Sequence, residues 1–78
     1  MNVQAQESKM YYVTMIRDNV GVARLSGPYA THDEALNLVD TVRNIAYDVD
    51  PRSHWDSFGT CGVTSVEHKP GVLNNRID

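Results

Sequence analysis

The chain has 78 residues, of which 41% are hydrophobic and 22% are charged, and its formal net charge is −3. This length fits one domain, near the lower limit for a chain that folds on its own core. The negative charge argues against direct binding of DNA or RNA, because nucleic-acid-binding proteins normally present a basic patch. A single cysteine allows no intramolecular disulfide, whereas a secreted domain of this size usually carries several. We therefore expect a cytoplasmic protein.

The ends of the chain differ in composition from the centre. Residues 1–8 are polar and patternless, which predicts a flexible leader rather than a signal peptide. Residues 74–78 predict a disordered tail. The single folded domain is expected over residues 9–73. No apolar run approaches the roughly 20 residues that a membrane span needs, so we expect no membrane association.

Two runs near the start of the chain predict a β-hairpin. Residues 9–17 are rich in aromatic and β-branched side chains, as strands are. The Asp-Asn pair at 18–19 is typical of turns, and residues 20–26 return as a second strand. The Gly-Pro pair at 27–28 is expected to end this strand, because proline cannot donate a hydrogen bond to a sheet.

The segment 31–49 has the clearest pattern and predicts a helix. Thr31 followed by Glu34 is a capping box, in which each side chain bonds to the other residue's backbone amide. Pro51 ends the helix, since it pushes the residue before it out of the α region. The spacing of the apolar residues predicts one buried face, formed by Ala35, Leu38, Val39, Val42, Ile45, Ala46 and Val49.

Residues 58–67 predict a third strand. Cys61 falls at a position that we expect to point inward, and Val72 with Leu73 offers a segment that can dock on the core. The predicted fold class is therefore α+β with ββαβ order. A three-stranded antiparallel sheet carries one amphipathic helix on one face, and the third strand lies beside the first, at the centre or at an edge.

One helix covers one face of such a sheet, so the other face is expected to be open. Alternation places there Tyr12, Thr14, Ile16, Val66 and either Val22 or Ala23. This surface is apolar enough to contact a second copy or another protein. Open edge strands offer a second route to a homodimer.

The segment 50–56 concentrates charged and aromatic side chains. It contains Arg52, His54, the only tryptophan Trp55, and Asp56. Tryptophan and arginine are typical of binding hot spots, which favours a partner-binding loop. The alternative is a structural corner in which Trp55 and Phe58 plug the core and Arg52 offsets the carboxylates at the helix end. No spacing here is diagnostic of zinc or calcium, and we expect no metal and no cofactor.

A row of acidic and amide side chains follows the predicted solvent face of the helix. This face is a candidate surface for a basic protein partner, although Arg43 reduces its charge and a plain solvated face is the alternative. The row consists of Asp33, Asn37, Asp40, Asn44 and Asp48.

His54 with Asp50 or Asp56 has the composition of an acid–base pair, and Cys61 that of a nucleophile. A lone cysteine in a strand is more often a small core residue. We therefore expect a protein that is not an enzyme.

Three segments carry a resemblance to a known group of proteins. They are YYVTMIR at 11–17, GPYATHDEAL at 27–36 and DPRSHWDSFGT at 50–60. Together they resemble small accessory proteins of phages, plasmids and other bacterial mobile elements. In size, acidity and lack of a catalytic motif the chain is also similar to anti-CRISPR proteins. The resemblance names no activity and assigns no functional residues. Our first hypothesis is a non-enzymatic module of a phage or mobile element that occludes a surface of a host protein or complex in the host cytoplasm. A homodimeric structural or regulatory domain that pairs through its open sheet face is the alternative.

Overall fold

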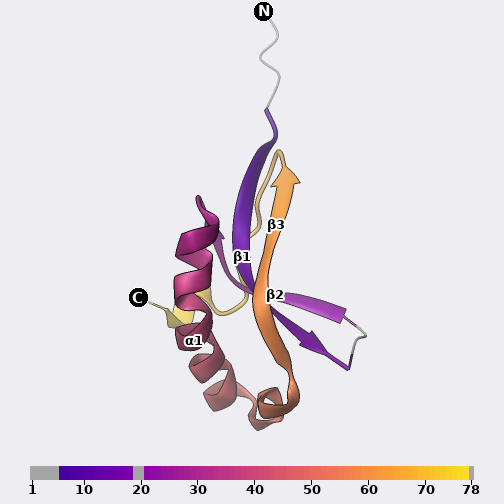
Figure 1. Ribbon diagram of the computed structural model, residues 1–78, viewed down its shortest axis with the longest axis vertical. Helices are drawn as coiled ribbons and strands as arrows, with labels where there is room; N and C mark the ends of the chain where they lie inside the picture. The colour runs from indigo at the N-terminus through magenta and orange to yellow at the C-terminus, as the bar shows by residue number, and fades with distance from the viewer. Residues whose placement is uncertain (1–5, 19–20, 78) are drawn as a thin grey trace, which may run out of the picture.

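The computed structural model describes residues 6–18 and 21–77 and consists of a three-stranded sheet with one α-helix on it. The elements in chain order are β1 (Ser8–Arg17), β2 (Gly21–Tyr29), α1 (His32–Val49), the 3-10 helix η1 (Pro51–Trp55), β3 (Ser57–Ser65) and the 3-10 helix η2 (Asn74–Arg76). The strand order is β2-β1-β3, both pairings are antiparallel, and α1 runs along one face of the sheet (Figure 1). The predicted α+β fold with ββαβ order is confirmed, and the third strand lies at an edge.

The second strand runs further than predicted, through the Gly-Pro pair to Tyr29. The pairing of β1 with β2 shifts register near this pair, and proline is tolerated at such irregularities and on edge strands. Gly27 has a φ of +125°, and a Cβ there would lie 2.8 Å from the carbonyl oxygen of Tyr11. Only glycine fits this conformation and this close approach. The preceding turn has Asp18 at a φ of 52°, while residues 19 and 20 lie outside the described residues.

Helix α1 begins and ends as predicted. The Thr31 hydroxyl accepts a hydrogen bond from the amide of Glu34 at 3.2 Å. The second half of the capping box is made differently, because the Thr31 hydroxyl also donates to Glu34 Oε1. The helix stops at Asp50, whose backbone is extended. No helix in residues 6–18 and 21–77 is long and apolar enough to cross a membrane.

The core lies between α1 and the sheet. The helix contributes part of the predicted stripe to it, while Val49 at the helix end is exposed. The buried cluster is formed by Val13, Leu25, Ala35, Val42, Ala46 and Leu73, with Leu38, Val39, Ile45, Phe58 and Ile77 packed around it.

Cys61 does not point toward this core. It pairs with Tyr12 of β1, and Tyr12 lies on the face opposite the helix-facing Val13. The prediction of an inward-facing cysteine was wrong. The helix face of β3 is instead formed by Phe58 and the positions that alternate with it. Two glycines in β3 leave a weak apolar alternation, which is why the pattern pointed to the wrong face.

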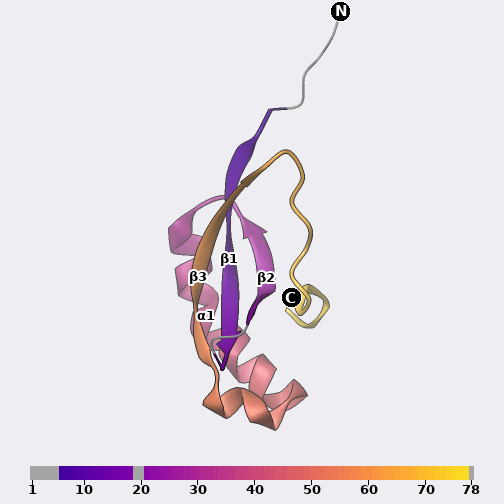
Figure 2. The same cartoon turned by 90° about the vertical axis from the view of Figure 1, so that its right-hand side faces the viewer.

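The segment after β3 folds back over β2. The amides of Gly71 and Leu73 donate to the carbonyl oxygens of Gly27 and Leu25, at 3.0 and 2.7 Å. Leu73 is only 8% exposed, so the predicted docking of this segment is confirmed. Figure 2 shows the segment beside β2, at the edge away from β3. We call residues 66–77 the C-terminal strap.

The strap also corrects the predicted tail at 74–78. Residues Asn74–Arg76 form η2 rather than a disordered end, and Ile77 packs against the core; residue 78 lies outside the described residues. At the other end, Ser8 belongs to β1, Gln6 and Glu7 are exposed, and residues 1–5 are not described.

The face opposite the helix is less open than predicted. Tyr12 and Thr14 are 0% and 4% exposed, because the strap and neighbouring side chains cover them. The Tyr12 hydroxyl donates to the carbonyl oxygen of Lys69 at 2.6 Å, and the Arg24 guanidinium lies over the Tyr12 ring. Ala23 packs against the helix-side core and so is not on this face.

Candidate functional site

The segment from Asp50 to Asp56 forms a tight corner between α1 and β3, which we call the Trp55 corner. Asp50 caps both helices that meet there, α1 at its C-terminal end and η1 at its N-terminal end. Its amide donates to the carbonyl oxygen of Ala46 at 2.8 Å, and its Oδ1 accepts from the amide of Arg52 at 3.0 Å. Ser53, the central residue of η1, is buried. The backbone of the corner is therefore fixed at its start and at its centre.

Three charged side chains join the corner to the end of β1. Arg17 Nε donates to both carboxylate oxygens of Asp56 at 3.1 Å, and Arg17 Nη2 lies 2.8 Å from Asp56 Oδ2. The Asp56 side chain is only 3% exposed, so this bidentate pair shields its charge within the protein. Arg17 Nη2 also reaches Asp50 Oδ2 at 3.3 Å. Arg17 thus holds both ends of the corner.

Arg52 binds Asp50 from the solvent side. Its Nε lies 3.1 and 3.2 Å from the two oxygens of Asp50, and its Nη2 lies 3.0 Å from Oδ2. These hydrogen bonds are the main cause that lowers the pKa of Asp50 from 3.8 to about 2. The same bonds raise the pKa of Arg52, while the hydrogen bonds that Arg17 donates to Asp56 raise the pKa of Arg17. The prediction that Arg52 offsets a carboxylate at the helix end is confirmed for Asp50.

The two aromatic residues predicted to plug the core behave differently. Phe58 is half-buried and meets the Tyr47 ring edge-on, with 6.0 Å between the ring centroids. Tyr47 also stacks on His54 at 3.9 Å. Trp55 is 90% exposed, which rules out the alternative in which it plugs the core. Because Tyr47 and Phe58 already fill the space beneath the corner, Trp55 projects into solvent.

A shallow hollow of about 350 Å³ adjoins Trp55. Its lining consists of Arg17, Asp18, Arg52, Trp55 and Asp56. The carboxylate of Asp56 is already bound by Arg17, whereas the Arg52 side chain is 77% exposed. The hollow therefore offers a partner the indole ring of Trp55 and the guanidinium group of Arg52. The ion pairs Arg17–Asp56 and Arg52–Asp50 hold its lining in place.

The acidic row on α1 also lies where it was predicted. Asp33, Asn37, Asp40, Asn44 and Asp48 are all exposed. Asp40 Oδ1 is bound by Arg43 Nη2 at 2.6 Å, so part of the charge is neutralised. The row extends for roughly 22 Å at about 1.5 Å per residue. It forms a surface of its own, and the hollow at the corner includes none of these five residues.

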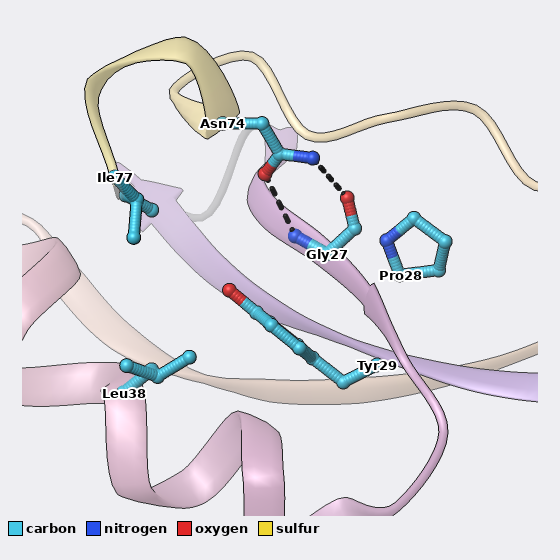
Figure 3. Close-up of a pocket in the computed structure, with 6 residues that line it drawn as sticks. All are labelled: Gly27, Pro28, Tyr29, Leu38, Asn74 and Ile77. Atoms are coloured by element: carbon cyan, nitrogen blue, oxygen red, sulfur yellow. Dashed lines mark hydrogen bonds between the residues drawn. The ribbon is translucent and has the colours of Figure 1, made fainter.

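A second hollow, of about 440 Å³, lies where the strap meets β2. Figure 3 shows that the Asn74 side chain points at the backbone of Gly27 and bonds to both its amide and its carbonyl group. Tyr29, Leu38 and Ile77 supply apolar walls. Because the side-chain amide of Asn74 already bonds to the backbone of Gly27, we interpret this hollow as the place where the strap is attached to β2.

The acid–base hypothesis requires His54 within hydrogen-bond reach of a carboxylate in a cleft. Over residues 6–18 and 21–77, His54 makes no hydrogen bond to Asp50 or Asp56 and stacks on Tyr47 instead. In the same part of the chain, no group of three or more His, Cys, Asp or Glu side chains could hold a metal ion.

Arg17 is the residue of this site that was not predicted. It stands at the end of a strand more than 30 residues before its partners, and no local pattern connects it to them. The available signal was the excess of carboxylates over cations in the segment 48–56, which one arginine could not balance.

No protein-family model, no curated protein and no solved structure matches the chain.

Proposed function

We propose that this chain is a non-enzymatic protein-binding domain that contacts its partner through the Trp55 corner. The observation that carries the proposal is Trp55 itself, which is the only tryptophan and is 90% exposed. Tryptophan and arginine are the residues most enriched among interface hot spots, and Arg52 stands beside Trp55 in the same hollow.

The fixed backbone of the corner supports this proposal. An exposed side chain gains affinity when its support is ordered before binding, because less conformational entropy is then lost. Asp50 and Asp56 hold the two ends of η1 through Arg17, and the central residue of η1, Ser53, is buried. The indole is thus presented from a rigid base, which is how an anchor residue works.

The resemblance to accessory proteins of mobile elements suggests the kind of partner. We propose a protein or protein complex of the bacterial host, whose surface the domain would occlude as anti-CRISPR proteins do. A partner with a basic surface could also reach the acidic row on α1, since Asp48 is exposed at the end of the helix nearest the corner.

The experiment is an affinity purification of the tagged protein from a bacterial lysate, with nuclease treatment and mass spectrometry. Wild type is compared with Trp55→Ala and with a matched control, Leu36→Ala, which truncates an exposed apolar residue in the N-terminal half of α1, away from the corner. Loss of a hot-spot side chain costs about 2 kcal/mol or more, so Trp55→Ala should weaken partner binding roughly 30-fold.

The outcomes separate the two candidate surfaces. Loss of a stoichiometric partner in Trp55→Ala, with an unchanged melting temperature and with Leu36→Ala still binding, supports the corner. Equal recovery with Trp55→Ala rejects it. Reversal of charge at Asp33, Asp40 and Asp48 together tests the acidic row, and a loss of binding in that variant alone would move the contact surface to α1.

A further inference from the structure

The two edges of the sheet differ in how they are protected. The outer edge of β2 receives backbone hydrogen bonds from Gly71, Val72 and Leu73 of the strap. The outer edge of β3 has no neighbouring strand in the described part of the chain. Figure 2 shows β3 as the outermost strand on the side away from the strap. One edge is thus capped within the chain, and the other offers a row of backbone donors and acceptors.

Nothing in the sequence of β3 discourages pairing with another strand. Natural edge strands are usually short, bulged, charged or interrupted by proline. β3 has nine residues, SFGTCGVTS, with no charge and no proline. Its pairing with β1 runs without a register shift, so its edge is regular along its whole length. The chain around it is acidic overall, which makes an uncharged strand of this length notable.

We propose that the β3 edge pairs, antiparallel and about a two-fold axis at Cys61, with the β3 edge of a second copy of this chain. The product is a homodimer with one continuous sheet of six strands. Opposed residues of an antiparallel pair point to the same face, so both α1 helices lie on one side of the joined sheet. This inference does not depend on the proposed role of Trp55.

The strand is complementary to itself in this arrangement. Cys61 is the central residue of β3, and pairing it with Cys61 of the second copy brings all nine residues into register. Gly59 then stands opposite Val63 of the second copy. A Cβ at Gly59 would have no atom of the described residues within 4 Å, so there is room for the valine side chain beside it. Each copy supplies one glycine and one valine, and the match therefore occurs twice.

The charges also permit the pairing. The nearest acidic residues outside the strand are Asp56 and Glu67. In this register Asp56 lies across from Val66 of the second copy, and Glu67 from Trp55, so the two carboxylates do not oppose each other. Like charges directly opposite destabilise strand pairs, and here the acidic chains meet through an uncharged segment. A second copy is therefore a better fit than a charged peptide.

The first test is the molar mass of the protein in solution, measured by light scattering and sedimentation over a range of concentrations. We expect a dimer. Gly59→Lys should raise the dimer dissociation constant roughly tenfold or more, since a lysine side chain fills the space opposite Val63 and places a charge against this apolar residue. Gly59→Ala is the matched control and should stay dimeric. A monomeric wild type, or a dimer that Gly59→Lys leaves unchanged, overturns the proposal.

Disulfide cross-linking tests the register of the two β3 strands directly. This second test does not depend on whether the Gly59→Lys variant folds. Opposed Cα atoms of an antiparallel pair are about 4.5–5.5 Å apart, within the range that a disulfide spans. Under diamide, two Cys61 thiols should lose two protons and two electrons to the reagent, which becomes the hydrazine, and form one disulfide between copies. Cys61→Ser with Thr64→Cys should give no such dimer, because the two Thr64 positions lie roughly 20 Å apart along the strands. Absence of the Cys61 cross-link, or equal cross-linking at position 64, rejects this pairing. The Cys61 cross-link would also be absent if another protein occupied the β3 edge, and that result likewise rejects the proposal.

Discussion

Truncation of Leu73 tests whether the C-terminal strap is part of the folded core. Leu73 is 8% exposed and belongs to the buried cluster with Leu25 and Val42, and its amide donates to the carbonyl oxygen of Leu25. Leu73→Ala removes three carbon atoms from this cluster. At about 0.8 kcal/mol for each buried methylene, the transfer cost alone is about 2.4 kcal/mol. The cavity left behind brings the expected loss of unfolding free energy to about 3 kcal/mol.

The assay is urea unfolding followed by circular dichroism, with both the midpoint and the slope recorded. For a small domain the slope is about 1 kcal/mol per M, so Leu73→Ala should lower the midpoint by about 3 M. Such a loss is a large part of the roughly 5–15 kcal/mol that stabilises a typical domain. An unchanged slope would show that the native and unfolded states keep their difference in exposed surface.

The neighbouring Val72 provides the matched control. It lies in the same strap but is 69% exposed, so Val72→Ala should change the unfolding free energy by less than about 0.5 kcal/mol. If Leu73→Ala is as mild as Val72→Ala, the strap does not contribute to the core, and the burial of Tyr12 beneath it would also be in doubt.

Three further predictions concern stability. Gly27→Ala should destabilise the fold by about 1–3 kcal/mol in thermal unfolding, because the residue has a φ of +125° and its new Cβ would crowd the Tyr11 carbonyl oxygen. The control is Gly59→Ala, which should change stability little because its Cβ meets open space among the described residues. Equal effects of the two substitutions would refute the argument. The pKa of Asp50 is lowered to about 2 from 3.8, so its stabilising effect is complete above about pH 4 and is lost as the pH falls toward 2. Asp50→Asn should therefore flatten the dependence of melting temperature on pH between 4 and 2, and an identical slope in both proteins would contradict the ion pair. Ser26→Ala should raise the unfolding free energy by about 1 kcal/mol in chemical denaturation, since it removes a buried hydroxyl group that has no hydrogen-bond partner among the described residues. A loss of stability in this variant would show that the hydroxyl is satisfied in solution.

Features controlled by neighbouring residues were predicted well. The start of α1 follows from Thr31 and Glu34, and its end from Pro51, because caps act within one turn of the helix. The three strands and their antiparallel order also followed from short apolar runs and turns. The continuation of β2 through Gly27 was missed, because it depends on a register shift and on hydrogen bonds from the strap.

The candidate site was predicted in part, and its errors have one physical origin. Composition placed Arg52 and Trp55 in the right segment, but whether Trp55 is buried depends on which rings fill the space below it. Tyr47 and Phe58 fill that space, and Tyr47 had no assigned role in the sequence pattern. Arg17 was missed for a similar reason, since its link to Asp56 spans 39 residues.

The strap has a consequence for how the protein is made. Asn74 binds Gly27 across 47 residues of chain, and Tyr12 binds Lys69 across 57. A ribosome adds about 5–20 residues per second, so the hairpin of β1 and β2 waits roughly 2–9 s before the residue that closes its outer edge has been synthesised. During that interval the outer edge of β2 lacks the backbone hydrogen bonds that the strap supplies in the finished protein. The rate of translation and the availability of chaperones should therefore affect the yield of this domain more than its final stability suggests.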